Sequence, residues 1–67
     1  MYHAHTTVIL LTAKYIHGGC VPGMIGRVVE SFGDGRYEVQ FADSRGITVA
    51  QMVVGEHDIM SIPDMND

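Results

Sequence analysis

The feature that most constrains the fold of this chain is an Asp-Gly turn placed between two strand-like segments. Gly33-Asp34-Gly35 follows the apolar segment 25–32 and precedes Arg36–Phe41, in which polar and apolar residues alternate strictly. Asp-Gly in this position favours a tight β-hairpin, whose turn residues adopt positive φ. Alternation sends every second side chain of 36–41 to one face of the sheet. The residues expected in the core are Tyr37, Val39 and Phe41.

The other strands and connections follow from short apolar segments separated by turn residues. We expect further strands at 7–12, 25–32, 47–54 and 59–62. Gly26 weakens any helix at 25–32 and indicates a bulge or sharp bend in that strand. Segment 13–23 contains three glycines and a proline without periodicity, which predicts a long irregular loop. Segment 55–58 suits one turn of 3₁₀ helix.

These elements predict an all-β domain, a small five-stranded barrel, closed or half-open, with a long first loop and a one-turn 3₁₀ helix before the last strand. The 67 residues divide into an N-terminal extension at 1–6, the barrel at 7–62 and a C-terminal tail at 63–67. Segment 7–12 is β-branched and apolar at its centre, which predicts a strand buried on much of both faces.

Charge and cysteine content exclude several classes of protein. Eight Asp and Glu against four Lys and Arg leave a net charge of −4, which argues against a general polyanion binder because phosphate contacts need clustered cations. The single cysteine excludes an intramolecular disulfide and favours a reducing compartment. The longest apolar run, 8–11, is far too short for a membrane helix. We therefore expect a soluble, cytoplasmic protein without a membrane partner.

The order of these segments resembles a family of small bacterial proteins catalogued as domain of unknown function 4926. The motifs that carry the resemblance are TVILLT at 7–12, PGMIGRVVE at 22–30, YEVQF at 37–41, AQMVV at 50–54 and DI at 58–59. The resemblance implies an SH3-like barrel whose central hairpin joins G-x-x-G-x-V to Y-E-V-x-F, and it implies no established activity. The chain departs from the family pattern at Gln51, where an apolar residue is expected, and in its histidine-rich start.

Gly23-Met24-Ile25-Gly26 admits two interpretations. A G-x-x-G loop clamps backbone phosphates in KH-type RNA-binding domains, where it joins two helices and has cations nearby. Here the flanking segments are predicted strands, and Arg27 is the one cation close by. The other interpretation is a turn that leads into a strand, and we assign the glycines to that role.

The imidazole and thiol groups are the available ligands for a transition metal. The candidates are His3, His5, His17 and Cys20. Alternation would place His3 and His5 on one face of an extended segment, and His17 and Cys20 have H-x-x-C spacing. The alternative is exposed histidines and a small buried thiol. Because a zinc site would need ligands from separate segments, we predict no metal and no cofactor, and the lack of a nucleophile motif predicts no enzymatic activity.

The remaining candidate for function is the surface. If Val8 and Leu10 face the core, alternate residues of that strand point outward and form an apolar patch, unless the long loop folds over it. Such a patch suits a homodimer or another protein partner. The residues assigned to the partner contact are Tyr15, Ile9, Leu11, Val29, Arg27 and Arg36.

We expect a non-enzymatic protein-binding module that contacts its partner through the 13–23 loop and the adjacent strands. The family resemblance permits a special case, an immunity or antitoxin protein that neutralises the product of a neighbouring gene. A distant likeness to the KOW segment of ribosomal barrels offers a second alternative, nucleic-acid binding. That alternative requires the four Lys and Arg residues to form one basic face, and the excess of acidic residues disfavours it.

Overall fold

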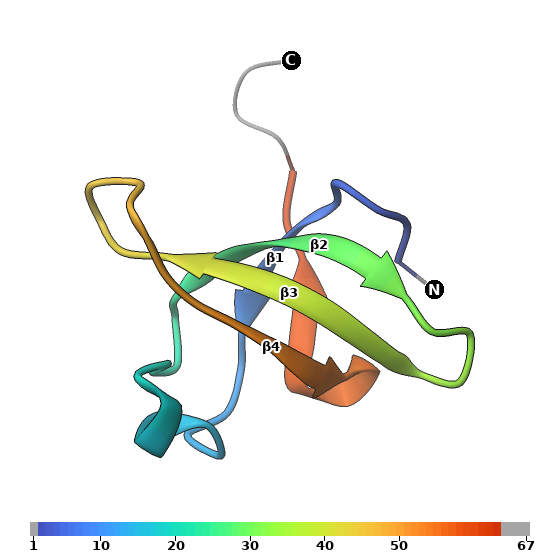
Figure 1. The fold of residues 1–67 in the computed structure, drawn as a ribbon, viewed down its shortest axis with the longest axis horizontal. Helices are drawn as coiled ribbons and strands as arrows, with labels where there is room; N and C mark the ends of the chain where they lie inside the picture. The colour runs from blue at the N-terminus through green and yellow to red at the C-terminus, as the bar shows by residue number, and fades with distance from the viewer. Residues whose placement is uncertain (1, 64–67) are drawn as a thin grey trace.

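Five antiparallel strands form one curled sheet in the computed structural model, which describes residues 2–63 (Figure 1). The elements are β1 (Thr7–Leu10), η1 (Ile16–Gly18), β2 (Ile25–Ser31), β3 (Arg36–Ala42), β4 (Thr48–Gly55), η2 (Glu56–Asp58) and β5 (Ile59–Ser61). The strand order is β4-β3-β2-β1-β5, so β4 and β5 border the sheet and do not pair with each other. The all-β prediction is confirmed, with its long first loop and its 3₁₀ turn before the last strand, and the barrel is the half-open form.

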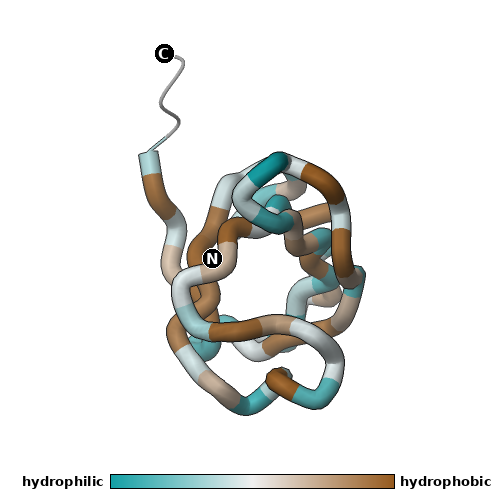
Figure 2. Tube along the Cα trace, turned by 90° about the vertical axis from the view of Figure 1, so that its left-hand side faces the viewer, coloured by the Kyte–Doolittle hydropathy of each residue, from teal (hydrophilic) through white to brown (hydrophobic). Residues whose placement is uncertain are grey.

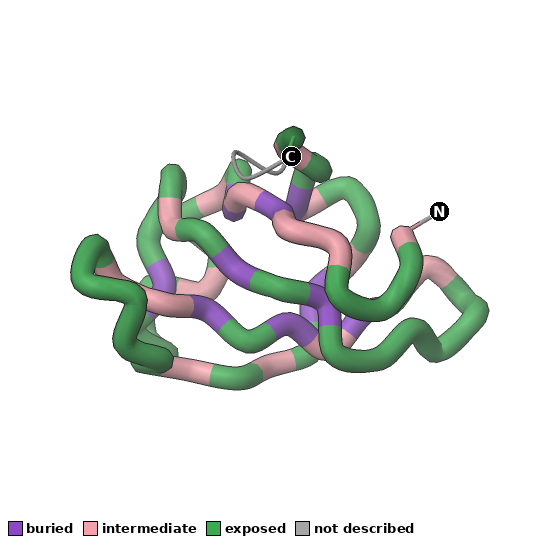
Figure 3. The backbone as a smooth tube through the Cα atoms, turned by 90° about the horizontal axis from the view of Figure 1, so that it is seen from above, coloured by how far each residue is buried: buried purple, intermediate pink, exposed green. Residues whose placement is uncertain are grey.

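The core lies on the concave face of this sheet. Along β3, hydrophobic and hydrophilic residues alternate and the buried positions follow the same period of two; Figures 2 and 3 colour the chain by hydropathy and by burial. The buried residues are Val8, Leu10, Cys20, Val28, Tyr37, Val39, Phe41, Val54 and Ile59. The inward positions predicted for the third strand are therefore confirmed, and in β1 the buried residues are Val8 and Leu10. No buried side-chain nitrogen or oxygen within 2–63 lacks a hydrogen-bond partner.

The strand boundaries differ from the predicted ones where backbone groups find partners outside the sheet. β1 ends at Leu10, two residues early, because the Leu11 N–H donates to the Asp58 carbonyl at 2.8 Å. β4 begins at Thr48, because the Ile47 N–H donates to the Asp43 carboxylate at 3.1 Å in the preceding turn. Polar groups of η2 and of the 43–47 turn thus set these two boundaries.

The prediction of a bulge or bend at Gly26 is wrong. Gly26 pairs regularly with Val8 on β1 and with Phe41 on β3, and the bulge in β2 lies between Val28 and Glu30. A Cβ atom on Gly26 would lie 2.6 Å from Cγ1 of Val39 and 2.8 Å from Cδ1 of Phe41. The glycine is therefore required by close packing of the core against the β2 backbone.

The hairpin between β2 and β3 is confirmed, but its turn differs from the predicted one. The Phe32 N–H donates to the Arg36 carbonyl at 3.1 Å across a three-residue loop. Gly33 and Gly35 have φ of 81° and 86°, whereas Asp34 does not have positive φ. The Asp34 carboxylate instead accepts hydrogen bonds from the backbone N–H and Nε of Arg36. The aspartate thus stabilises the turn through its side chain.

Residues 2–6 pack against the sheet. The His5 N–H donates to the Val28 carbonyl at 2.6 Å, and the Val28 N–H donates to the Thr6 carbonyl at 2.9 Å. His5 has φ of 72°, and the Thr6 N–H donates to the His3 carbonyl, which closes a turn. The prediction that His3 and His5 share one face of an extended segment is therefore wrong. The tail predicted at 63–67 lies, from residue 64 on, outside the described residues.

Candidate functional site

A row of four apolar side chains crosses the outer face of the sheet. Ile9 on β1 pairs with Met60 on β5 and with Ile25 on β2, and Ile25 pairs in turn with Ala42 on β3. Side chains opposite each other on one face of a sheet have Cβ atoms about 5 Å apart and touch. Ile25 is 41% exposed and Met60 50%, while Ile9 and Ala42 are half-buried. We call these four residues the outer apolar row.

Two shallow pockets flank the Ile25–Ala42 pair of this row. The first, of about 430 Å³, lies between the end of the first loop and the β3–β4 turn. Its lining residues are Val21, Pro22, Gly23, Met24, Ile25, Ala42, Asp43 and Ser44. The second, of about 310 Å³, continues along the outer face and is lined by Thr7, Ile25, Gly26, Arg27, Gln40, Ala42, Gly46 and Thr48. The row is therefore bordered by two pockets, of which the first is mainly apolar and the second more polar.

Arg27 is the cation that faces this second pocket. The other three cations have acidic partners: Lys14 lies 3.6 Å from Asp58, Arg36 2.9 Å from Asp34 and Arg45 3.2 Å from Asp43. Within the described range, no carboxylate lies within ion-pair distance of Arg27. Its neighbours across the strands are Thr7 on β1 and Gln40 on β3. Within residues 2–63, the site thus combines an apolar row with one cation that has no acidic partner and can bind an anionic group.

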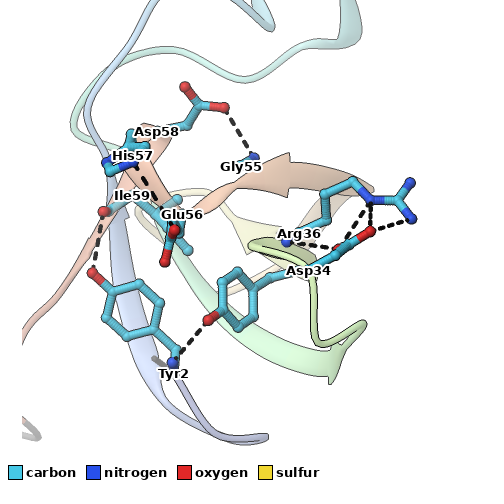
Figure 4. A network of polar contacts seen from close by, with 9 residues as sticks. Tyr2, Asp34, Arg36, Gly55, Glu56, His57, Asp58 and Ile59 are labelled. Atoms are coloured by element: carbon cyan, nitrogen blue, oxygen red, sulfur yellow. Dashed lines mark hydrogen bonds and ion pairs between the residues drawn. The ribbon is translucent and has the colours of Figure 1, made fainter.

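A polar network fixes the first loop next to η2. The Tyr15 hydroxyl and the Gly55 N–H both donate to Oδ2 of Asp58, and Lys14 lies near the same oxygen. Figure 4 shows the Gly55–Asp58 contact, and the hydrogen bond from Tyr2 to the Ile59 carbonyl beside it. Burial by itself raises the pKa of the Asp58 carboxyl. The hydrogen bonds from these donors and the Lys14 charge lower the pKa by more than burial raises it, so the net shift is downward. Burial and the bond to Asp58 raise the pKa of Tyr15.

The structure brings together only some of the residues that the sequence assigned to a partner contact. Ile9 and Arg27 lie on the outer face, in and beside the row. Tyr15 and Leu11 lie at η2, where the hydroxyl of one and the N–H of the other bond Asp58. The two remaining residues lie toward the β2–β3 hairpin turn: Val29 at the bulge of β2, and Arg36 paired with Asp34 and 5.5 Å from the centre of the Phe32 ring.

Sequence reasoning missed Ile25 and Met60 as surface residues. Both were assigned to strands, but neither strand was given a direction for its side chains. The signal was available for Ile25, because it has the same parity in β2 as the charged Arg27 and must share its outward face. Met60 had no such signal, because β5 spans only Ile59–Ser61 and its direction depends on its pairing with β1.

The candidate metal ligands are dispersed. Cys20 is fully buried in the core, and burial raises the pKa of its thiol. His17 lies on η1 and is exposed, while His3 and His5 lie in the N-terminal turn. Across the described part of the chain, no three His, Cys, Asp or Glu side chains are placed to share one metal ion. Over the same residues, no helix has the length and apolarity that crossing a membrane requires.

Comparisons with known proteins give a family and no function. The family model described as domain of unknown function (DUF4926) matches residues 5–61, which is most of the 67-residue chain. The comparison with curated proteins found no match, and neither did the comparison with solved structures. The chain belongs to the DUF4926 family.

Proposed function

We propose that this domain is a non-enzymatic protein-binding module that contacts its partner through the outer apolar row and the end of the first loop. The observation that carries the proposal is the row itself: Ile25 and Met60 remain 41% and 50% exposed although they belong to one continuous set of cross-strand neighbours. Scattered exposed apolar residues are ordinary, whereas a contiguous set beside a hollow is typical of an interaction surface. Val21 and Pro22 extend this set from the loop.

The chemistry of the surface defines the class of partner. The apolar pocket beside Ile25 suits a bulky aliphatic or aromatic side chain, since its walls are Val21, Pro22 and Met24. Arg27, which lines the second pocket together with Ile25, suits a carboxylate of the partner on the same face. We therefore propose a partner segment in which a bulky apolar residue lies next to an acidic residue. A toxin neutralised by direct binding is one possible partner, as an immunity or antitoxin role would require.

Nucleic-acid binding has less support. Lys14, Arg36 and Arg45 each lie within ion-pair distance of an aspartate, which reduces the positive potential that each offers to phosphate. In the part of the chain that the structure describes, Arg27 is the one Lys or Arg outside ion-pair distance of a carboxylate, and the chain has a net charge of −4. Phosphate-backbone binding needs several such cations on one face, because each contributes separately to affinity.

The experiment is a selection of displayed peptides on the immobilised full chain, followed by calorimetric titration of the enriched peptides. Ile25→Lys is expected to weaken their binding at least about tenfold, because it places a charge in the centre of the row. Arg27→Gln is expected to weaken the binding of acidic peptides about two- to fivefold, as the loss of an exposed ion pair would. It is also expected to reduce the dependence of this binding on salt concentration.

Val29→Lys is the matched control. Val29 lies on the same strand as Ile25 and is 36% exposed, but it lies outside the row and its pockets. The proposal requires that Val29→Lys leave the affinity unchanged. Equal loss of binding in Ile25→Lys and Val29→Lys would contradict it, as would a selection that enriches no peptide at all.

A further inference from the structure

β4 is a long border strand that pairs with a single neighbouring strand among residues 2–63. It spans eight residues, Thr48–Gly55, and pairs on one side with β3. Among the described residues, no backbone–backbone hydrogen bond joins β4 to an element other than β3, and at the end of the strand the Gly55 N–H donates to the Asp58 carboxylate. Before Gly55, the edge therefore presents backbone N–H and C=O groups to solvent, and such groups can pair with a further strand.

β4 also lacks the usual features that protect a border strand. Its sequence TVAQMVVG contains no charged residue and no proline. Val49 and Val53 are 47% and 43% exposed. A bulge at Val49 shifts the register with β3 at the beginning of the strand, but the six residues from Ala50 to Gly55 pair regularly. Charges, proline and bulges are the devices that natural sheets use against edge pairing, and only the last occurs here.

The opposite border of the sheet differs. β5 has three residues, and Pro63, which has no backbone N–H, follows closely. A short strand that ends near a proline offers few groups to a partner. The two borders are therefore unequal, and edge pairing is expected at β4.

We propose that β4 pairs edge to edge with β4 of a second copy, antiparallel and about a two-fold axis. In a two-fold strand pair, any charge in β4 is present once in each copy, so two like charges would lie in the same strand pair and repel each other most near the axis. β4 is neutral over all eight residues, whereas each copy as a whole carries −4. A neutral border strand with exposed valines can therefore pair with its own copy without charge repulsion inside the strand pair.

The proposed dimer leaves the outer apolar row available. The row lies on β5, β1, β2 and β3, and β4 contributes no residue to it. Edge pairing at β4 would then join two sheets into one continuous sheet with a row on each half. Loss of the dimer and loss of peptide binding are therefore separable outcomes.

The test is the molar mass of the full chain by light scattering and sedimentation equilibrium, up to millimolar concentration. The wild type is expected to dimerise, and added salt is expected to strengthen the dimer by screening the repulsion between two acidic copies. Val53→Lys places a charge on the outer face of β4 and is expected to weaken dimerisation at least about tenfold. Val29→Lys adds the same charge on β2, which is paired on both sides, and should leave the dimer unchanged.

Three results would overturn the proposal. The first is a wild type that stays monomeric at the highest concentration, and the second is a Val53→Lys variant that dimerises as the wild type does. The third is a dimer that Ile25→Lys disrupts and Val53→Lys does not, because it would place the contact on the outer apolar row. Circular dichroism of each variant establishes that the sheet is intact. Slowed hydrogen exchange of β4 amides as the concentration rises would support the proposal directly.

Discussion

Gly26 occupies the position where the backbone of β2 comes closest to the core. Its neighbours Val39 and Phe41 are fully buried, and the space that a Cβ would need is already filled by their side chains. A glycine inside a predicted strand indicates a bulge, a bend or a close approach of other atoms to the backbone. The sequence does not distinguish these three causes, because they differ in which residues pack against the glycine. At Gly26 these neighbours come from β3 and lie 13 and 15 residues further along the chain.

Gly26→Ala is therefore expected to destabilise the fold by about 1–3 kcal/mol, the cost of overpacking a filled core. Urea unfolding measures it. Gly18→Ala is the control, because the nearest atom there is the terminal methyl of Met52, which can move aside. We expect that variant to stay within about 0.5 kcal/mol of the wild type. Equal unfolding free energies for Gly26→Ala and the wild type would show that Val39 and Phe41 are not held as described.

Hydrogen bonds join the first loop to η2. Tyr15 and Leu11 reach from the loop to the side chain and the carbonyl of Asp58 respectively. The Asp58 side chain is 14% exposed, so its hydrogen bonds are largely shielded from water. This network explains why a loop with little regular structure has a defined position next to β5.

Asp58→Asn is expected to destabilise the domain by about 1–3 kcal/mol at neutral pH, because partly buried donors lose their charged acceptor. The folded pKa of Asp58 lies below its unfolded value of about 3.9. The unfolded chain therefore binds the proton first as the pH falls, and this stabilisation is present above about pH 4 and lost below it. Urea unfolding at neutral and acidic pH measures the difference, which should shrink in acid.

Tyr15→Phe provides the control for this network. It removes one donor to Asp58 and keeps the carboxylate, so we expect a smaller loss, of about 1 kcal/mol, at neutral pH. A gap between the wild type and Asp58→Asn that stays constant from neutral to acidic pH would contradict a role for the ionised carboxylate.

The elements themselves were largely predictable, because each depends on local sequence. Alternation at 36–41 and the Gly33-Asp34-Gly35 turn are properties of adjacent residues, and both appear in the structure as β3 and its hairpin. Their boundaries were less predictable, since β1 ends where Leu11 bonds Asp58, a residue far away in the chain.

Over the whole molecule, function depends on which outward side chains become neighbours. Ile9 and Arg27 were predicted as surface residues from alternation and charge. Their grouping with Ile25 and Met60 depends on the register of β1 with β2 and β5, which no local pattern encodes. The separation of Val29 and Arg36 from this group has the same origin. Individual surface residues were thus predictable from the sequence, but which of them become neighbours was not.

The most direct test of the proposed binding surface is an NMR titration of the ¹⁵N-labelled full chain with a selected peptide. Chemical-shift changes are expected to concentrate at the outer apolar row, at Arg27 and at 21–25, and to leave η2 and the β2–β3 turn unchanged. The same changes should disappear in Ile25→Lys and persist in Val29→Lys. Shift changes centred instead on 11–18 or on Val29 and Arg36 would contradict the outer apolar row as the binding surface.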